Sequence, residues 1–281
     1  MSHSIVLERF GLLRNPFSPE IDADSLLQFR SFQQAEMRLL EALPRRGLVL
    51  VAGESGAGKT ALARHFRRQL APSSYLTLYV AAASLKNPVR GVVEELLHQL
   101  GEPIPFNNPA RGLRRLQQAL ARAHEQNQTP VIVVDDVHYL GPEAWLLLKS
   151  LTNQEMDSRS PVLLVLLGAR TEVAAVLALS RLAEVKNRLL FCYHLRGLAE
   201  EEIVAYLEAH LKWAGSTRPV FTREIAQEIH RRCHGLPRPI NRLAYGCLLA
   251  AAFEKKELVD NPCLEQAASE LVLSHPVEVK S

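Results

Sequence analysis

A glycine-rich stretch early in the chain has the residue types and spacing of a phosphate-binding loop. It fits Gly-x-x-x-x-Gly-Lys-Ser/Thr at every position. Glycines let backbone N–H groups curl around phosphate oxygens, while Lys59 would reach the β- and γ-phosphates and the hydroxyl of Thr60 would coordinate Mg²⁺. The expected nucleotide-binding residues are Gly53, Glu54, Ser55, Gly56, Ala57, Gly58, Lys59 and Thr60.

The surroundings of this loop distinguish it from a chance glycine-rich turn. An apolar run at residues 47–52, typical of a buried strand, ends immediately before it, and a helical pattern begins inside it. The N-terminus of that helix would add a dipole that favours negative charge. The sequence therefore predicts a binding site for the phosphates of ATP with Mg²⁺.

A pair of carboxylates follows a second apolar run. Residues 131–134 are Val-Ile-Val-Val, and Asp135 and Asp136 come directly after them. Ligands bind at the carboxyl ends of parallel strands, so Asp135 is expected to hold Mg²⁺, directly or through water, and Asp136 to polarise the attacking water. Taken alone, these residues fit a strand with an acidic turn equally well, but a phosphate loop in the same chain favours the catalytic interpretation.

Alternating strand and helix patterns predict the scaffold that positions these groups. The expected strands are at 47–52, 75–82, 130–134, 161–167 and 188–195. The expected helices between and before them are at 32–43, 60–70, 88–100, 112–124 and 142–151. This alternation predicts an α/β fold, a P-loop core with a parallel sheet sandwiched by helices.

The last third of the chain has a different character. Helical periodicity runs through 199–214, 222–233 and 239–254, with no strand pattern among them. We expect an all-helical lid subdomain at the C-terminal side of the core. The expected division is a segment and helix packing on the core at 1–46, the nucleotide-binding core at 47–198, the lid at 199–270 and a flexible tail at 271–281.

Bulk composition limits the class of protein. The 281 residues are 47% hydrophobic and 22% charged with a net charge of +3, as in an ordinary soluble protein that permits a nucleic-acid partner without requiring one. The four cysteines have no CxxC spacing, and the cluster His230, Cys233 and His234 fits ordinary helix residues better than metal ligands. With no signal peptide and no apolar run near the ~20 residues that span a bilayer, a cytoplasmic location is expected.

Several separated blocks resemble the ExeA-like branch of the AAA+ ATPases. The resemblance runs from about residue 8 to about residue 250. It rests on Phe10-Gly11-Leu12 with Asn15-Pro16-Phe17-Ser18, the phosphate loop, the block at 135–140, Tyr193-His194-Leu195 with Leu198, and Gly-Leu-Pro-Arg-Pro-Ile-Asn-Arg-Leu at 235–243. It implies an AAA+ core with a helical lid that binds and hydrolyses ATP.

The resemblance also implies roles for residues outside the two motifs. Arg188 matches the arginine finger, which reaches the γ-phosphate of a neighbouring subunit, so the active form would be a homo-oligomer, either a ring or a filament. Arg238 matches the sensor-2 arginine that ties the lid to nucleotide; a guanidinium suits both roles, although both could be surface arginines. The segment Asn15, Pro16 and Phe17 would line the adenine pocket, or alternatively serve as a hydrophobic staple against the core.

Two departures from the family pattern bear on the rate of hydrolysis. The family usually has Asp-Glu where this chain has Asp135-Asp136, and a displacement of ~1 Å can cost ~10²-fold in rate. The family usually has Gly-Gln after the later strand, where this chain has Gly168 and Ala169. These departures predict slow hydrolysis, which suits a switch better than a motor.

The resemblance leaves the task of the ATPase open among three kinds. Related secretion proteins carry a transmembrane helix and a cell-wall module, which this chain lacks, so we favour the stand-alone kind. That kind is similar to transposition ATPases of the TnsC, MuB, TniB and IstB kind, which assemble on double-stranded DNA and recruit a transposase. The alternatives are an assembly ATPase acting on protein partners without DNA, and a scaffold that binds ATP without hydrolysis.

A basic surface for DNA phosphates is expected after the second strand and ahead of the next long helix. No recognition helix or zinc finger is evident, so contacts would be independent of base sequence. The same residues fit a solvated basic helix face, and that alternative stays open. The candidates are Lys86, Arg90, Arg111, Arg114 and Arg115.

Overall fold

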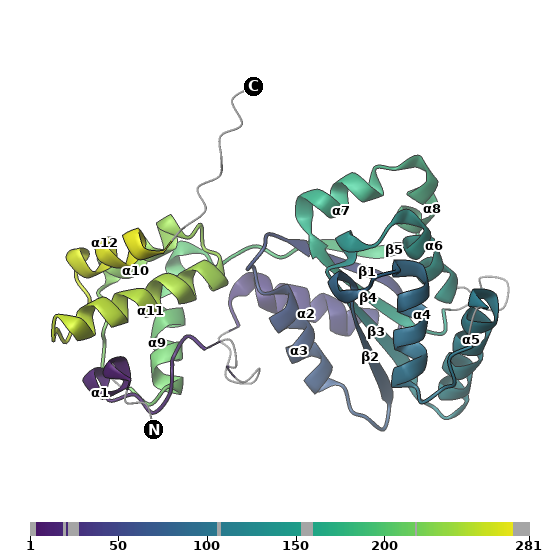
Figure 1. Cartoon of the computed structure of the whole chain (residues 1–281), viewed down its shortest axis with the longest axis horizontal. Coiled ribbons are helices and arrows are strands. Elements are labelled where there is room, and N and C mark those ends of the chain that lie inside the picture. The colour runs from purple at the N-terminus through teal and green to yellow at the C-terminus, as the bar shows by residue number, and fades with distance from the viewer. Residues whose placement is uncertain are drawn as a thin grey trace. The chain divides into compact units, whose positions relative to one another are not determined.

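The computed structural model describes residues 4–18, 21, 28–105, 108–152, 160–216 and 218–271. The chain forms two compact units (Figure 1). The core unit comprises Phe32–Ser55 and Lys59–Leu195, and the helical unit comprises Met1–Ser31, Gly56–Gly58 and Arg196–Ser281. From residue 272 on, the predicted tail lies outside the described residues.

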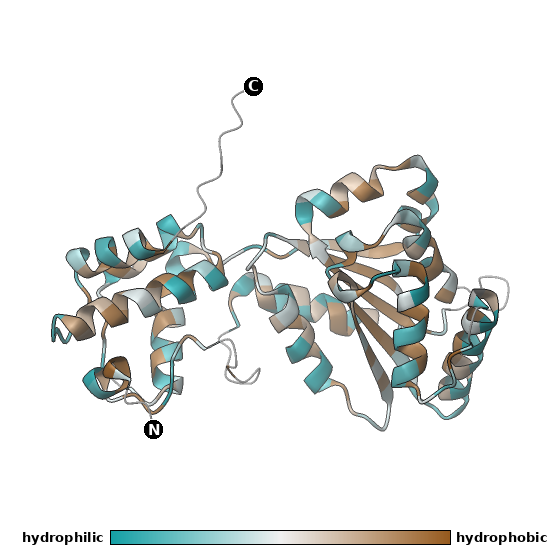
Figure 2. Ribbon diagram, viewed as in Figure 1, coloured by the Kyte–Doolittle hydropathy of each residue, from teal (hydrophilic) through white to brown (hydrophobic). Residues whose placement is uncertain are grey.

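The core unit contains a five-stranded parallel sheet with the order β2-β3-β4-β1-β5. Its strands are apolar along most of their length, as Figure 2 shows. The predicted parallel α/β sheet is confirmed, with small shifts at the strand ends. The strands are β1 (Gly47–Gly53), β2 (Tyr75–Ala81), β3 (Thr129–Asp135), β4 (Leu163–Ala169) and β5 (Leu189–His194).

Helices surround this sheet. Two start signals are clear: Asn87 and Asn108 accept the backbone N–H groups of Arg90 and Arg111 and are followed by proline, the pattern of a capped helix start. The helices are α2 (Arg30–Ala42), α3 (Lys59–Gln69), α4 (Pro88–Gln99), α5 (Pro109–Glu125), α6 (Pro142–Leu151), α7 (Arg170–Leu177) and α8 (Ala183–Asn187). Short 3-10 turns lie at Ala82–Ser84, Val137–Tyr139 and Ser180–Leu182.

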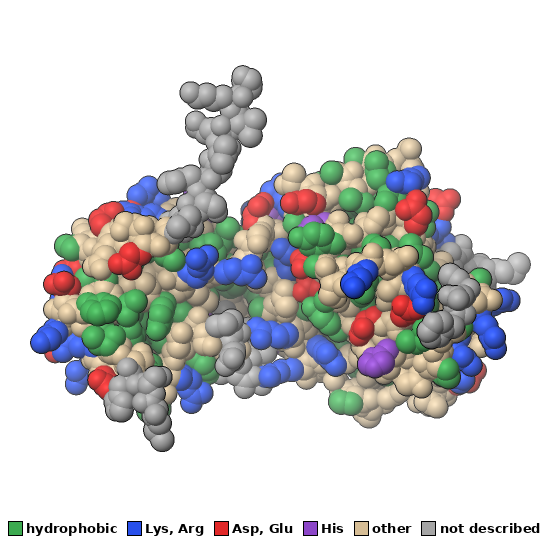
Figure 3. Space-filling model, viewed as in Figure 1, with side chains coloured by type: hydrophobic (Ala, Val, Ile, Leu, Met, Phe, Trp, Pro, Cys, Tyr) green, Lys and Arg blue, Asp and Glu red, His purple; other side chains and the backbone are tan. Residues whose placement is uncertain are grey.

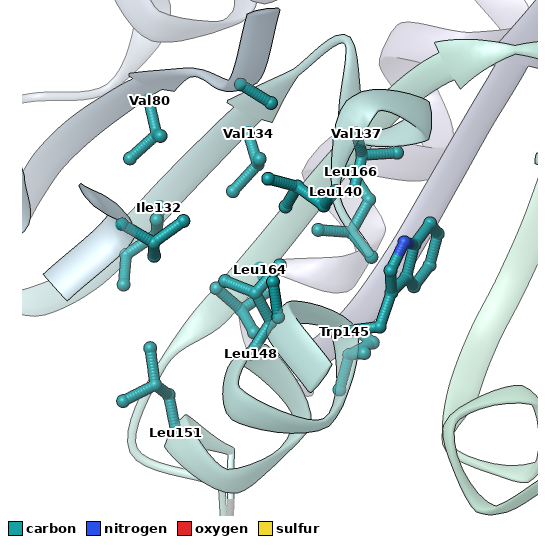
Figure 4. Close-up of a cluster of buried hydrophobic side chains, with 14 of the residues drawn as sticks. Val80, Ile132, Val134, Val137, Leu140, Trp145, Leu148, Leu151, Leu164 and Leu166 are labelled. Atoms are coloured by element: carbon teal, nitrogen blue, oxygen red, sulfur yellow. The ribbon is translucent and has the colours of Figure 1, made fainter. Parts of the chain in front are cut away.

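One face of the sheet forms the main apolar core. Alternate strand residues, such as Ile132 and Leu164, pack with side chains of α4, α5 and α6. Figure 4 shows Leu148 of α6 next to Leu164 and the ring of Trp145 on the side of Leu166 and Val137; Trp145 is fully buried. This packing fixes the strand register at the carboxyl edge, where the phosphate loop and the acid pair emerge.

The helical unit gathers the C-terminal helices and the N-terminal segment. Its helices are α1 (Ile5–Phe10), α9 (Ile203–Trp213), α10 (Arg223–Arg232), α11 (Pro237–Phe253) and α12 (Asn261–Glu270), with a 3-10 turn at Glu200–Glu202. No helix among the described residues is long and apolar enough to cross a membrane.

The position of the N-terminal segment differs from the expected division. Residues 1–46 were expected to pack on the core, but the segment before α2 belongs to the helical unit. The N–H of Leu13 donates to the carbonyl of Ala214 at 2.8 Å, and Arg9 Nε donates to the carbonyl of Lys256 at 2.9 Å. Burial explains the difference, because Leu12 and Phe17 lose their contact with water in this unit.

A buried histidine contacts this segment, and its burial predicts a pH-dependent stability of the helical unit. His210 Nδ1 donates to the carbonyl of Pro16 at 2.7 Å, and its ring stacks on Phe17 with centroids 5.3 Å apart. Its Nε2 is buried without a partner among the described residues. Burial lowers the pKa of His210, because a charged ring there would be poorly solvated.

We expect the melting temperature to fall between pH 7 and pH 5. The folded pKa lies below the unfolded value of about 6.5, so the unfolded chain binds the proton first and stability is lost as pH drops through that value. His210→Gln keeps a donor for Pro16 and should reduce this pH-dependent loss, whereas His98→Ala, at an exposed position on α4, should retain it. An equal loss in wild-type and His210→Gln protein would contradict the assignment to His210.

Candidate nucleotide site

The phosphate loop connects the end of β1 at Gly53 to the start of α3 at Lys59. Gly56 and Gly58 have φ angles of 85° and 100°, which L side chains rarely adopt. The two glycines therefore permit the backbone turn between β1 and α3. Strand, loop and helix follow one another as the sequence predicts.

Gly56 lies against the start of α11. The N–H of Arg238 donates to the carbonyl of Gly56 at 3.2 Å. A Cβ atom at Gly56 would be 3.0 Å from Cβ of Arg238 and 3.2 Å from Cδ of Pro239, so no side chain fits there without a shift. The candidate sensor-2 arginine, which is exposed, thus lies beside Gly56.

Lys59 is held by the carbonyl groups of its own loop. Its Nζ donates to the carbonyls of Gly53 at 2.8 Å and Glu54 at 3.0 Å, and its side chain is buried. The two carbonyl acceptors offset part of the cost of burying an ammonium. Lys59 is thereby positioned to exchange a carbonyl partner for a phosphate oxygen.

Thr60 and Asp135 join the two predicted motifs. Thr60 Oγ1 donates to Asp135 Oδ2 at 2.7 Å, and Asp135 is 4% exposed. A hydroxyl and a carboxylate oxygen are hard ligands of the kind that Mg²⁺ prefers. Their closeness places both predicted Mg²⁺ ligands where one cation would contact them together.

Tyr79 of β2 is a site residue that was not predicted. Its hydroxyl donates to the same Asp135 Oδ2 at 3.3 Å. Burial first, and then the charge of Asp135, its hydrogen bond and the charge of Asp136, raise the pKa of Tyr79 to about 12. Tyr79 therefore stays protonated at neutral pH and donates to the carboxylate. Tyr79 pairs with Val133 on the neighbouring strand, two positions before Asp135, and no pattern within one segment of the sequence predicts this pairing.

Asp136 begins the turn after β3 in a left-handed conformation. Its φ is 54°, and its N–H donates to Asp135 Oδ1 at 2.9 Å. Aspartate and asparagine tolerate this backbone conformation better than most residues. The half-buried carboxylate thus follows Asp135 at the carboxyl edge of the sheet.

Position 169, where the resemblance predicts a missing polar contact, adjoins a histidine. The N–H of Ala169 donates to His138 Nδ1 at 3.3 Å. His138 follows Asp136 by two residues and is half-buried. The side chain at position 169 is apolar as expected, but a polar ring from the neighbouring turn lies at the same strand end.

Arg188 lies at the amino-terminal ends of the strands, whereas the phosphate loop lies at their carboxyl ends. It immediately precedes β5, whose first residue Leu189 pairs with Leu48. Leu48 is five positions before Gly53, which at ~3.3 Å per residue is roughly 16 Å along the strand. The pKa of Glu184 is lowered, chiefly by Lys149 and to a smaller degree by Arg188.

The predicted adenine-pocket segment makes contacts within the helical unit. The N–H of Phe17 donates to Asn15 Oδ1 at 2.9 Å, closing a local turn. Pro16 and Phe17 are the partners of His210 described above. These contacts lie within the helical unit, whereas the alternative was a hydrophobic staple against the core, and a role in adenine binding stays a prediction.

The predicted DNA contacts lie on the core unit around the starts of α4 and α5. Arg90 pairs with Glu94 at 2.6 Å, and Arg115 with Glu102 at 3.6 Å. Figure 3 shows basic and acidic side chains next to each other over α4. Three candidates are exposed and make no ion pair with another described residue: Lys86, Arg111 and Arg114.

The parallel sheet, the phosphate loop after β1 and the acids after β3 define a P-loop ATPase core of the AAA+ type. Residues 43–177 match the AAA domain family. The chain is 31% identical over 248 residues to General secretion pathway protein A of Aeromonas hydrophila, covering 86% of this chain and 44% of that relative. The chain is an ExeA-like AAA+ ATPase, as the motifs predicted. It spans less than half the length of this curated relative.

Solved structures with low sequence identity share the fold. The ORC2 protein of Aeropyrum pernix aligns with a TM-score of 0.70 and 15% identity, over 92% of this chain and 71% of that chain. The ORC1 protein of the same organism, solved in complex with DNA, gives 0.67 and 23% over 91% and 68%. RuvB of Thermotoga maritima, a Holliday junction branch migration motor, gives 0.58 and 17% over 90% and 72%. These likenesses confirm the fold class.

Proposed function

We propose that the chain is an ATP-controlled switch that assembles into a homo-oligomer on double-stranded DNA and hydrolyses ATP slowly. The observation that carries this proposal is the separation of Arg188 from the phosphate loop of its own subunit, roughly 16 Å along β1. An arginine finger in that position acts on the next subunit in a head-to-tail assembly. ATP bound at each loop then controls the contact between subunits.

Mg²⁺ and ATP fit the residues at the loop. Thr60 Oγ1 and Asp135 Oδ2, 2.7 Å apart, would share the cation, and Tyr79 would hold Asp135 in orientation. Bound Mg²⁺ supplies charge neutralisation for the transferred phosphoryl group. Lys59 binds phosphate oxygens and Asp136 orients the attacking water, while the sensor-2 role of Arg238 stays a prediction from the resemblance.

Slow hydrolysis follows from the two departures in this site. Asp136 is one methylene shorter than the glutamate of the family pattern, and Ala169 has no polar side chain for the γ-phosphate. Both shortfalls reduce transition-state contacts more than nucleotide binding. A turnover of several ATP per second by the purified protein would contradict this part of the proposal.

Binding to DNA rests on the basic residues at two helix starts. Lys86, Arg111 and Arg114 are exposed, and the N-terminal dipoles of α4 and α5 add positive potential. Such contacts would bind phosphates without selecting a base sequence. The complex of Aeropyrum pernix ORC1 with DNA supports the same activity for this fold. Recruitment of a transposase and selection of its target stay predictions from the resemblance.

A second candidate is an assembly ATPase for secretion that acts on protein partners. The identity of 31% with General secretion pathway protein A favours it. It shares the nucleotide site and the trans arginine with the first candidate. The two differ in one measurable property, because the secretion candidate has no dependence on DNA.

Fluorescence anisotropy of a labelled duplex of random sequence distinguishes the two candidates. The protein is titrated with ATP, a slowly hydrolysed ATP analogue, ADP or no nucleotide, across a series of salt concentrations. Tight, salt-dependent binding confined to the triphosphate states is expected for the DNA switch. No binding in any state at low salt and micromolar protein favours the secretion candidate and leaves the ATPase site unaffected.

Removing the three exposed charges should weaken DNA binding and its salt dependence together. For the triple change of Lys86, Arg111 and Arg114 to Ala, the slope of log K against log salt should shrink by about 2.7, or roughly 0.9 per lost contact. Nucleotide affinity should not change. A matched triple change of Lys212, Arg218 and Arg223, exposed on the helical unit, should keep the wild-type slope. Equal slopes for the two triple variants would contradict this placement of the DNA surface.

A further inference from the structure

We propose that His138 contacts the γ-phosphate of ATP and partly replaces the polar side chain that position 169 lacks. The inference rests on the proposed function, since it concerns how the same site distinguishes ATP from ADP. It assigns a catalytic contact to a residue outside the two nucleotide motifs.

Register places the end of β4 between the two motifs. β4 lies between β3 and β1 in the sheet. Ala169, its last residue, pairs with Gly53, the first residue of the phosphate loop. On the other side, β3 ends at Asp135 and pairs with β4 through Val134 and Leu166. A donor at the end of β4 is therefore flanked by the loop and the acid pair, where a γ-phosphate bound by that loop would lie.

The hydrogen bond of the ring determines which nitrogen carries the proton. Nδ1 of His138 accepts from the N–H of Ala169 at 3.3 Å, so Nδ1 is unprotonated and the neutral ring carries its proton on Nε2. Nε2 makes no hydrogen bond with another described residue, and the residue is half-buried. A fixed N–H donor is thus available at this strand end, a suitable partner for a phosphate oxygen.

Packing holds the 3-10 turn Val137–Tyr139, which contains His138, close to β4. A Cβ atom at Gly168 would lie 2.4 Å from Cγ2 of Val173, 3.1 Å from Cγ1 of Val137 and 3.7 Å from the backbone N of His138. Glycine at this position therefore allows the turn after Asp136 to lie directly against the strand. The ring of Tyr139, with its centroid 4.5 Å from that of His138, restricts the imidazole further.

The alternative is that His138 only satisfies the N–H at the end of β4. Asparagine separates the two roles, because its Oδ1 takes a position close to that of Nδ1 and it has no atom at the position of Nε2. A structural role predicts that His138→Asn behaves as wild type. Contact with the γ-phosphate predicts that His138→Asn behaves as His138→Ala.

The experiment measures the dissociation constants of a non-hydrolysable ATP analogue and of ADP, together with the turnover of ATP, on the full chain. For His138→Asn and His138→Ala, we expect unchanged ADP affinity, analogue binding weakened about tenfold or more, and reduced turnover, because a hydrogen bond to a charged group is lost. Ala169→Gln in the His138→Asn background should restore part of the preference for the ATP analogue over ADP. The matched control is His98→Ala, at an exposed position on α4, which should not change the ratio of the dissociation constants for ADP and the ATP analogue.

If His138→Asn melts as wild type does and prefers the ATP analogue over ADP to the same degree, the role of His138 is overturned and the proposed function stays intact. Loss of affinity for ADP and the analogue by the same factor would overturn it as well, because the effect would then not depend on the γ-phosphate. Wild-type protein that binds neither nucleotide would refute the proposed function itself, and this inference with it.

Discussion

Replacing Arg188 by alanine is expected to leave ATP binding unchanged and to lower hydrolysis by about 10³-fold or more, the range seen for arginine fingers in P-loop enzymes. Arg188 precedes β5 at the amino-terminal end of the strand, whereas the phosphate loop lies at the carboxyl end of β1. We therefore expect no contribution of Arg188 to ATP binding in its own subunit. In the assembled form its guanidinium would neutralise charge that develops on the γ-phosphate of the neighbour. Nucleotide titration and steady-state turnover test the two halves of this expectation.

A mixing experiment distinguishes action between subunits from an indirect effect on the fold. Arg188→Ala supplies an intact loop and acid pair, whereas Asp136→Asn supplies an intact arginine. In an equimolar random mixture, roughly a quarter of the interfaces combine an intact loop with an intact arginine from the next subunit. Partial recovery of turnover from two weakly active variants is expected. Wild-type turnover in Arg188→Ala alone, or no recovery when co-assembly is demonstrated by labelled subunits, would contradict the trans role.

The sequence predicted the features of the site that depend on local chain order. A phosphate loop needs glycines at fixed spacing between a strand and a helix, and Gly56 and Gly58 have the positive φ angles that this turn requires. The acids after residues 131–134 likewise follow from a buried apolar strand with polar residues at its end. Since strand and helix periodicities are themselves local, the parallel sheet was predicted with them.

The parts that could not be predicted depend on which strands become neighbours. Tyr79 reaches Asp135 because β2 pairs with β3, and His138 reaches Ala169 because β4 pairs with β3. Neither pairing is encoded in the spacing of one segment. The helices α7 and α8 were not predicted because each buries a single side chain, Val173 and Val185, too little to give a periodic pattern.

The location of the N-terminal segment was also beyond local reasoning. Its apolar residues Leu12 and Phe17 require burial on some surface, but their spacing does not say which. The structure pairs Phe17 with His210 of α9, a contact between residues 193 positions apart in the sequence. A histidine at a buried position of a helix does not indicate by itself that its Nδ1 donates to the carbonyl of Pro16.

Asp136→Asn is expected to retain ATP binding and to lower turnover by about 10²–10⁴-fold, because the variant loses the carboxylate that accepts a proton from the attacking water. Asparagine tolerates the φ of 54° as well as aspartate does, so the turn and the N–H bond to Asp135 should persist. The ATP state then lasts longer, and any DNA-bound assembly that depends on it should dissociate more slowly. Turnover assays and dissociation from labelled duplex after dilution measure both effects.

Asp136→Glu is the informative companion change. Glutamate restores the length of the family pattern, but it is less favourable than aspartate at a positive φ, so a lower melting temperature is expected with this variant. If its turnover per folded molecule exceeds that of wild type, side-chain length limits hydrolysis in this chain. Wild-type turnover in Asp136→Asn would remove Asp136 from the mechanism, since no carboxylate would then be needed at this position to orient the water.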